Sequence, residues 1–186
     1  MKRRTIRRLT GRALLPLLVG LLLSACAAAN PAPSGMDSAP AGSPCNLAAL
    51  TPAATWQRTA NSLDGVLTLT NYTGQACALQ GTPSLQLLGE NGQALQVDSI
   101  LSSNQVETEI TLEPEASAAA RFTWSNWCES DGPGSLSLRV RLTSHSGQLD
   151  VQVQGPNGRP LEDTPGCQDG SAPSTLSAEP FQSPAP

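Results

Sequence analysis

LDGVLTLTNYTGQACALQGTPSLQLL, residues 63–88, is the stretch that decides the fold class of this chain. Leu67 and Leu69 alternate with polar or β-branched neighbours, which is the period of two of a half-buried strand. Turn residues follow at 71–74 and again at 81–83, with Cys77 between them, before a second alternating run begins. A strand bracketed by turns, with a cysteine just past its end, is typical of a small oxidised β domain outside the cytosol.

The same alternation recurs downstream. It covers residues 106–112, 120–125, 136–142 and 149–154, and Gly89–Gly92 supplies an Asn-Gly hairpin signal that Leu95 and Val97 follow. No helical periodicity of useful length is present. The pattern predicts an all-β domain over residues 45–181, in which about seven to nine strands form two antiparallel sheets packed face to face.

The N-terminal 25 residues have the pattern of an export signal. A basic region precedes a short apolar run, Ala13–Leu23, which is well below the ~20 residues that span a bilayer. The run ends in Leu23-Ser24-Ala25-Cys26, which resembles the lipobox of bacterial lipoproteins. That resemblance implies cleavage before Cys26 and a lipid on its thiol. The alternative is an ordinary secretory signal that ends in small residues.

Beyond the signal the chain is acidic and lacks lysine. Five arginines and fifteen acidic residues give 5 − 15 = −10 from Cys26 onward. So few scattered cations make a nucleic-acid interface or attraction to anionic lipid unexpected, and contact with the membrane is expected to rest on the Cys26 lipid. Residues 26–44 consist mainly of Ala, Pro, Ser and Gly, which predicts a disordered tether, and residues 182–186 predict a short disordered tail.

Four cysteines remain after Cys26, and an even number in an exported chain predicts two disulfides. Their spacings fit neither a CxxC redox motif nor a paired-CxxC zinc site. Three connectivities are open. We favour Cys45–Cys77 with Cys128–Cys167, in which each bridge closes a loop of a few dozen residues.

The domain resembles a family of bacterial secreted and lipid-anchored domains of unassigned function, frequent in actinobacteria. The resemblance extends from Cys45 to about Phe181. Its most specific part is Cys77-Ala78-Leu79-Gln80-Gly81-Thr82-Pro83, preceded by Leu69-Thr70-Asn71 and followed by Trp127-Cys128, a last cysteine and a closing strand near Leu176. It implies an immunoglobulin-like β-sandwich with paired cysteines and supplies no catalytic residues.

Residues that suggest enzyme chemistry are better explained otherwise. His145 is the single histidine and lies in a predicted hairpin tip, without an adjacent nucleophile motif. The acidic run Glu107, Glu109, Glu113 and Glu115 lacks calcium-loop spacing, and its strand residues should form a solvated face. We therefore expect no catalytic residue, no metal site and no cofactor.

A recognition surface is predicted around Trp127 and the loop that follows it. Trp124 shares the inward face of its strand with Phe122 and should be core. Trp127 has left that pattern, and if exposed it could anchor a partner together with Glu129 and Asp131. In the alternative, Trp127 covers the Cys128 bridge.

The sequence thus predicts a lipid-anchored protein of the bacterial cell envelope, located outside the cytoplasm, with a non-enzymatic binding or interaction module. An envelope protein or a glycan is the expected partner. The alternatives are a cell-wall-associated hydrolase and an accessory ligand-binding subunit of an envelope complex.

Overall fold

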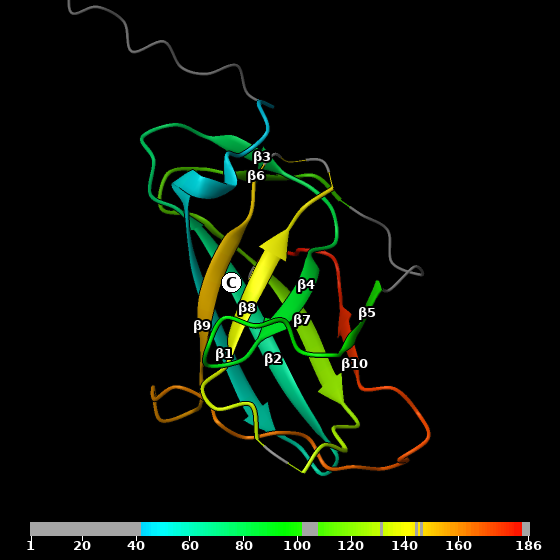
Figure 1. The fold of residues 1–186 in the computed structure, drawn as a ribbon. Coiled ribbons are helices and arrows are strands. Elements are labelled where there is room, and N and C mark those ends of the chain that lie inside the picture. Colours follow the sequence, from blue (N-terminus) through cyan, green and yellow to red (C-terminus); the bar gives the residue numbers. More distant parts are fainter. Residues whose placement is uncertain (1–41, 102–107, 131, 144, 146, 184–186) are drawn as a thin grey trace, which may run out of the picture. The chain divides into compact units, whose positions relative to one another are not determined.

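The computed structural model describes residues 42–101, 108–130, 132–143, 145 and 147–183, and these form an all-β domain (Figure 1). No helix of the described residues is long and apolar enough to cross a membrane. The elements are η1 (Leu47–Ala49), β1 (Leu50–Arg58), β2 (Ser62–Asn71), β3 (Cys77–Leu79), β4 (Ser84–Leu88), β5 (Asp98–Leu101), β6 (Ile110–Leu112), β7 (Ser117–Ser125), β8 (Ser137–Arg141), β9 (Leu149–Gln154) and β10 (Thr175–Ala178).

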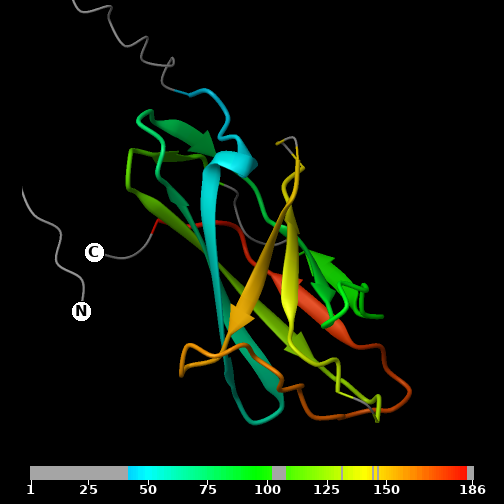
Figure 2. The same ribbon diagram turned by 60° about the vertical axis from the view of Figure 1, so that its left-hand side comes forward.

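Eight strands form one strongly curved sheet, in the order β4-β8-β9-β1-β2-β7-β10-β5, and β3 pairs with β6 in a small second sheet. The large sheet curls until β4 comes close to β10 and β5, as Figures 1 and 2 show from two sides. The predicted all-β class with two disulfides is confirmed.

Two details of the prediction need correction. The sheet is mixed, because β1 pairs in parallel with β9 and β10 pairs in parallel with β5. The two strands of each pair run in the same direction, so they can hydrogen-bond only as a parallel pair. The described residues also contain ten strands rather than seven to nine, because the short β3 and β6 pair separately.

The Asn-Gly turn leads into less strand than expected. Leu95 N donates to Leu87 O at 2.9 Å, but Val97 N then donates to Leu95 O, and this tight turn carries the chain away toward β5. The predicted strand from Val106 begins outside the described residues, and its described part is β6, Ile110–Leu112.

Strands β1, β2 and β7 form the centre of the large sheet. Nine residue pairs join β1 to β2, from Leu50 opposite Asn71 to Arg58 opposite Leu63. Strand β2 shows strict alternation of buried and half-buried residues, as predicted from its leucines. One face of these strands therefore packs into the core, while the other face carries threonine, serine, glutamine and a few charges.

Aromatic side chains fill the core behind these strands. Trp56 stacks on Trp124 with ring centroids 5.7 Å apart and packs at a tilt against Phe122 at 5.0 Å. Gly65 lies opposite Trp56 on β2, and a Cβ there would overlap both the Trp56 and Phe122 rings. The glycine therefore makes room for the rings.

The two disulfides pair as predicted, Cys45–Cys77 and Cys128–Cys167. The described chain enters beside the first bridge, where Cys45 N donates to Ala78 O and Ala78 N donates to Ser43 O, both at 2.8 Å. Ser43, which the sequence assigned to the tether, is thus hydrogen-bonded to β3. The second bridge follows the end of β7, and the loop that carries Cys167 is hydrogen-bonded to the β1–β2 turn, where Gln168 Nε2 donates to Asn61 O at 3.1 Å.

Candidate functional site

A hollow of about 450 Å³ opens on the outer face of β1, β2 and β7, beside the loop that follows β9. We call it the β7 groove. Its side-chain lining comes mainly from Thr55, Gln57, Asp64, Val66, Arg121 and Gln154, with Gly155, Pro156 and Gly158 forming the loop wall. The groove lies toward the end of β1 that is remote from Cys45.

Strand register places these side chains together. Thr55, Val66 and Arg121 form one row across the sheet, because Val66 lies opposite both of the others. Asp64 lies opposite Gln57 and Thr123 in the next row. Residues in neighbouring rows on one face are close enough for long side chains to meet.

The loop wall is closed by its own hydrogen bonds. Gly155 N donates to Arg159 O at 2.8 Å, and Gly158 N donates to Gly155 O at 2.9 Å. Gly158 has a φ of +72°, a backbone conformation that glycine adopts without steric cost. The parallel pairing of Gln154 with Thr55 holds this loop beside β1.

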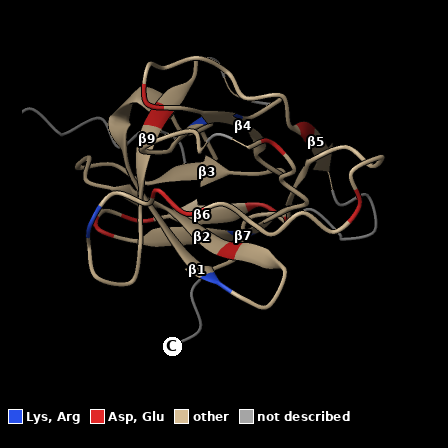
Figure 3. Ribbon diagram, turned by 60° about the horizontal axis from the view of Figure 1, so that its bottom comes forward, with Lys and Arg blue, Asp and Glu red and all other residues tan. Residues whose placement is uncertain are grey.

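The groove carries one positive and one negative side chain. Asp64 Oδ1 accepts hydrogen bonds from Thr123 Oγ1 at 2.9 Å and Ser62 Oγ at 3.3 Å. Arg121 is exposed, and its guanidinium forms no hydrogen bond or ion pair with any described residue. Figure 3 shows that the basic residues of the described chain are scattered rather than gathered in one stripe.

The predicted recognition surface differs from expectation at its centre. Trp127 is 7% exposed and belongs to the core, where it packs edge-on against Trp124 with ring centroids 5.3 Å apart. The expectation of an exposed Trp127 anchor is therefore wrong, because the indole completes the aromatic cluster. Glu129 is exposed beside a small hollow of about 210 Å³, and Asp131 lies outside the described residues.

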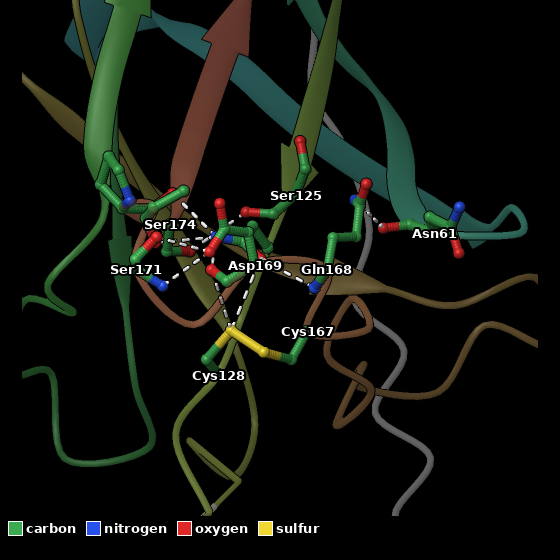
Figure 4. The surroundings of a disulfide bond; sticks show 11 residues. Asn61, Ser125, Cys128, Cys167, Gln168, Asp169, Ser171 and Ser174 are labelled. Atoms are coloured by element: carbon green, nitrogen blue, oxygen red, sulfur yellow. Dashed lines mark hydrogen bonds between the residues drawn. A yellow bond between two sulfur atoms is a disulfide. The ribbon is translucent and has the colours of Figure 1, made fainter.

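The residue before Trp127 organises this end of the domain. Asn126 is 8% exposed with a φ of +61°, and its Nδ2 donates to the carbonyls of Asp169 and Ala172 at 2.9 and 2.8 Å. Its Oδ1 accepts from the backbone N–H groups of Gln168 and Asp169. Figure 4 shows this loop folded against the Cys128–Cys167 bridge.

Asp169 also fixes the loop through its carboxylate. Ser171 donates to Oδ1 through its hydroxyl at 2.6 Å and through its backbone N–H at 2.8 Å. These hydrogen bonds favour the charged form and lower the pKa of Asp169. The loop is thereby closed locally as well as through Asn126.

The other predicted residues are not brought together. His145 is half-buried near β3, with Nε2 3.3 Å from Ala78 O. Glu109, Glu113 and Glu115 are exposed, while Glu107 and the lipidation candidate Cys26 lie outside the described residues. The described part of the chain contains no group of three or more His, Cys, Asp or Glu side chains that could hold a metal.

Sequence reasoning missed most of the groove. Strand β1 was not predicted, because Pro52 interrupts its alternation, although buried Ala54 and Trp56 do alternate with exposed Thr55 and Gln57. The sequence correctly placed Arg121 on the face of its strand that points away from Phe122 and the core. Nothing in the sequence indicates that the loop after β9 lies beside β1.

Comparison with known proteins identifies the family to which the chain belongs. No curated protein and no solved structure matches the chain, whereas the family model described as Domain of unknown function (DUF4232) matches residues 45–182. This match covers both disulfides, every strand and the β7 groove, and most of the chain. The chain therefore belongs to the DUF4232 family of domains of unknown function.

Proposed function

We propose that this chain is a lipid-anchored protein of the bacterial cell envelope whose DUF4232 domain is a non-enzymatic binding module. The observation that carries the proposal is that the Cys45 end of the domain and the β7 groove lie apart. The tether joins the domain beside Cys45–Cys77, and the β7 groove lies toward the opposite end of β1. A lipid on Cys26 would thus attach the domain through its Cys45 end, and this attachment would not use the residues of the groove.

The disulfides support a location outside the cytoplasm. Two bridges within one domain persist in oxidising compartments and are rare where thiols are kept reduced. The basic and apolar N-terminal residues followed by Leu23-Ser24-Ala25-Cys26 fit export with lipid attachment.

We further propose that the scaffold is a variant of the immunoglobulin-like sandwich. The order β1-β2-β7 corresponds to strands A-B-E of that fold, and β4-β8-β9 corresponds to its C-F-G sheet. Strand β10 occupies the position of strand D beside β7, although it follows β9 in the chain. The parallel β1–β9 pair joins the two sheets. The β7 groove combines the outer face of the first of these sheets with the loop after β9, and a paired sheet of this kind holds such a loop in a fixed position.

Site-specific photo-crosslinking in the native envelope tests the binding role. A photoreactive residue at Gln57 lies in the β7 groove, and one at Thr51 lies on the same face of the same strand outside it. The two positions are roughly 20 Å apart at the usual rise of a strand. We expect Gln57 to give a discrete crosslinked product, with an envelope protein, a glycan or a small ligand and detected by the mass it adds, that Thr51 does not give. Identical products from both positions, or none, would contradict the proposal.

A further inference from the structure

We propose that the β7 groove binds a small organic carboxylate, with Arg121 as the group that receives it. This inference rests on the proposed binding function and adds the chemical class of the ligand. The groove volume of about 450 Å³ lies within the usual range for small-molecule sites.

Arg121 and Arg159 differ from the other three arginines of the described chain in that no described residue pairs with their guanidinium groups, and of these two only Arg121 lines the groove. Arg58 donates to Thr164 O and pairs with Asp163, and Arg139 makes two hydrogen bonds to Asp150. Arg141 donates twice to Gln148 Oε1. Arg121 lines the groove, and its planar set of donors has no partner among the described residues. A guanidinium binds a carboxylate through two parallel hydrogen bonds, so this group is a ready anion receptor.

The rest of the lining sets the character of the ligand. Thr55, Gln57 and Gln154 offer hydroxyl and amide groups that hydrogen-bond neutral polar substituents. Asp64, the carboxylate in the lining, already accepts two hydroxyl hydrogen bonds at Oδ1. A carboxylate that also carries hydroxyl or amide groups therefore matches the groove better than an apolar acid does. Hexuronates and N-acyl amino acids share this chemistry.

Saturation-transfer NMR on the mature lipidated chain in micelles tests the inference. The probes are glucuronate with glucose as its neutral twin, and N-acetylalanine with its amide as the neutral twin. We expect at least one carboxylate to bind while its neutral twin does not, and the pair that responds separates a sugar acid from an amino-acid derivative. Equal binding of acid and twin, or no binding of either acid, would overturn the proposal.

Matched variants locate the site. Arg121→Gln should weaken carboxylate binding by about tenfold or more, as expected for the loss of charged hydrogen bonds, whereas Arg141→Gln should leave it unchanged. Thr55→Tyr should fill the groove and block binding, whereas Ala53→Tyr, two residues earlier on the same exposed face, should not. Melting curves verify that each variant is folded. Binding that survives both Arg121→Gln and Thr55→Tyr would place the ligand elsewhere.

Failure here can be told apart from failure of the proposed function. If the probes do not bind but crosslinking at Gln57 still captures a partner, the binding module stands and the carboxylate class is wrong. If crosslinking at Gln57 also fails, the proposed function itself is contradicted.

Discussion

Two buried asparagines link neighbouring segments at the two disulfide ends of the domain. Asn71 is fully buried, and its Nδ2 donates to Gln75 O at 2.8 Å and Leu112 O at 2.9 Å, which ties β2 to β6 near Cys45–Cys77. Asn126 does the same for the loop around Cys167. An amide can both donate and accept, so one side chain satisfies several backbone groups that would otherwise be buried without partners.

Asn126→Ala should destabilise the domain by about 2–4 kcal/mol. The substitution leaves backbone groups of residues 168–173 without their hydrogen-bond partner, and it places alanine at a positive φ. Asn126→Gly removes the side chain but tolerates that φ, so it should cost less than alanine. Chemical denaturation measures both values. Asn91→Ala, at an exposed asparagine, is the control. An Asn126→Ala variant as stable as this control would contradict a stabilising role for the Asn126 hydrogen bonds.

Gly65→Ala should destabilise the domain by roughly 1–3 kcal/mol, because the added methyl overlaps the rings of Trp56 and Phe122 in a closely packed core. The melting temperature should fall by several degrees. Gly74 has open space around its Cβ position and no positive φ, so Gly74→Ala should change stability little. Equal melting temperatures for the two variants would show that the core accommodates the methyl.

At the level of elements, the two bridges differ in their access to solvent. Cys45 is 3% exposed, whereas Cys128 and Cys167 are both exposed. A reductant in solution therefore reaches the second bridge without any opening of the core.

Limited reduction should consequently release Cys128 and Cys167 before Cys45 and Cys77. Thiol alkylation at increasing reductant concentration, followed by peptide mass mapping, measures the order. Replacing either pair by alanine should cost about 2–5 kcal/mol through the lost constraint on the unfolded chain. Earlier labelling of Cys45 would refute the accessibility argument.

The β8–β9 hairpin carries a pH-dependent contact. Arg139 donates two hydrogen bonds to Asp150, at 2.9 and 2.8 Å, and this contact lowers the pKa of Asp150 from its usual value. A lowered folded-state pKa stabilises the domain above the unfolded pKa, and the contribution is lost as pH falls through the folded value. The effect is small because the pair is partly exposed.

Arg139→Gln should therefore lower the melting temperature slightly at pH 7, and the difference from wild type should shrink as pH falls below about 4. Arg141→Gln is the comparison, because Arg141 lowers the pKa of Asp150 only as the last of its causes. A difference for Arg139→Gln that is unchanged down to pH 2 would show that the contact acts through packing rather than charge.

The strands that could be predicted from the sequence are those in which apolar and polar residues alternate along the whole strand. Strands β2, β7, β8 and β9 each alternate between more and less buried residues, so their leucines, valines and aromatics fix both strand and face. Strand β5 could not be predicted in this way, because all four of its residues are exposed. It is a strand only because β10 provides a hydrogen-bonding edge.

At the scale of the whole domain, the site was harder to predict than the fold. The β7 groove combines β1, β2, β7 and a loop beyond β9, which are far apart in sequence. Local patterns give the face of Arg121, but its neighbours depend on strand order. The sequence placed Gln182 in a disordered tail, yet it exchanges backbone hydrogen bonds with Ala119 at 2.8 and 2.9 Å.

Cys26→Ser should move the protein from the detergent phase to the aqueous phase in a phase-partition assay, because the proposed lipid is its membrane attachment. Thermal unfolding of the domain should be unchanged, since Cys26 precedes both disulfides and all of the described strands. Cys45→Ser provides the contrast, with partition retained and stability reduced. Unaltered membrane retention of Cys26→Ser would refute lipid attachment at this residue.

The long β1–β2 pairing has a mechanical consequence. If a partner held at the groove were pulled away from a membrane-held tether, the force would enter at Cys45 and run along β1. The nine residue pairs between β1 and β2 would then be loaded together in shear, because antiparallel hydrogen bonds lie across the strand axis. The Cys45–Cys77 bridge would divert part of that pull into β3. Under that load the β1–β2 pairing would resist separation more strongly than under a pull that peels β1 away from one end.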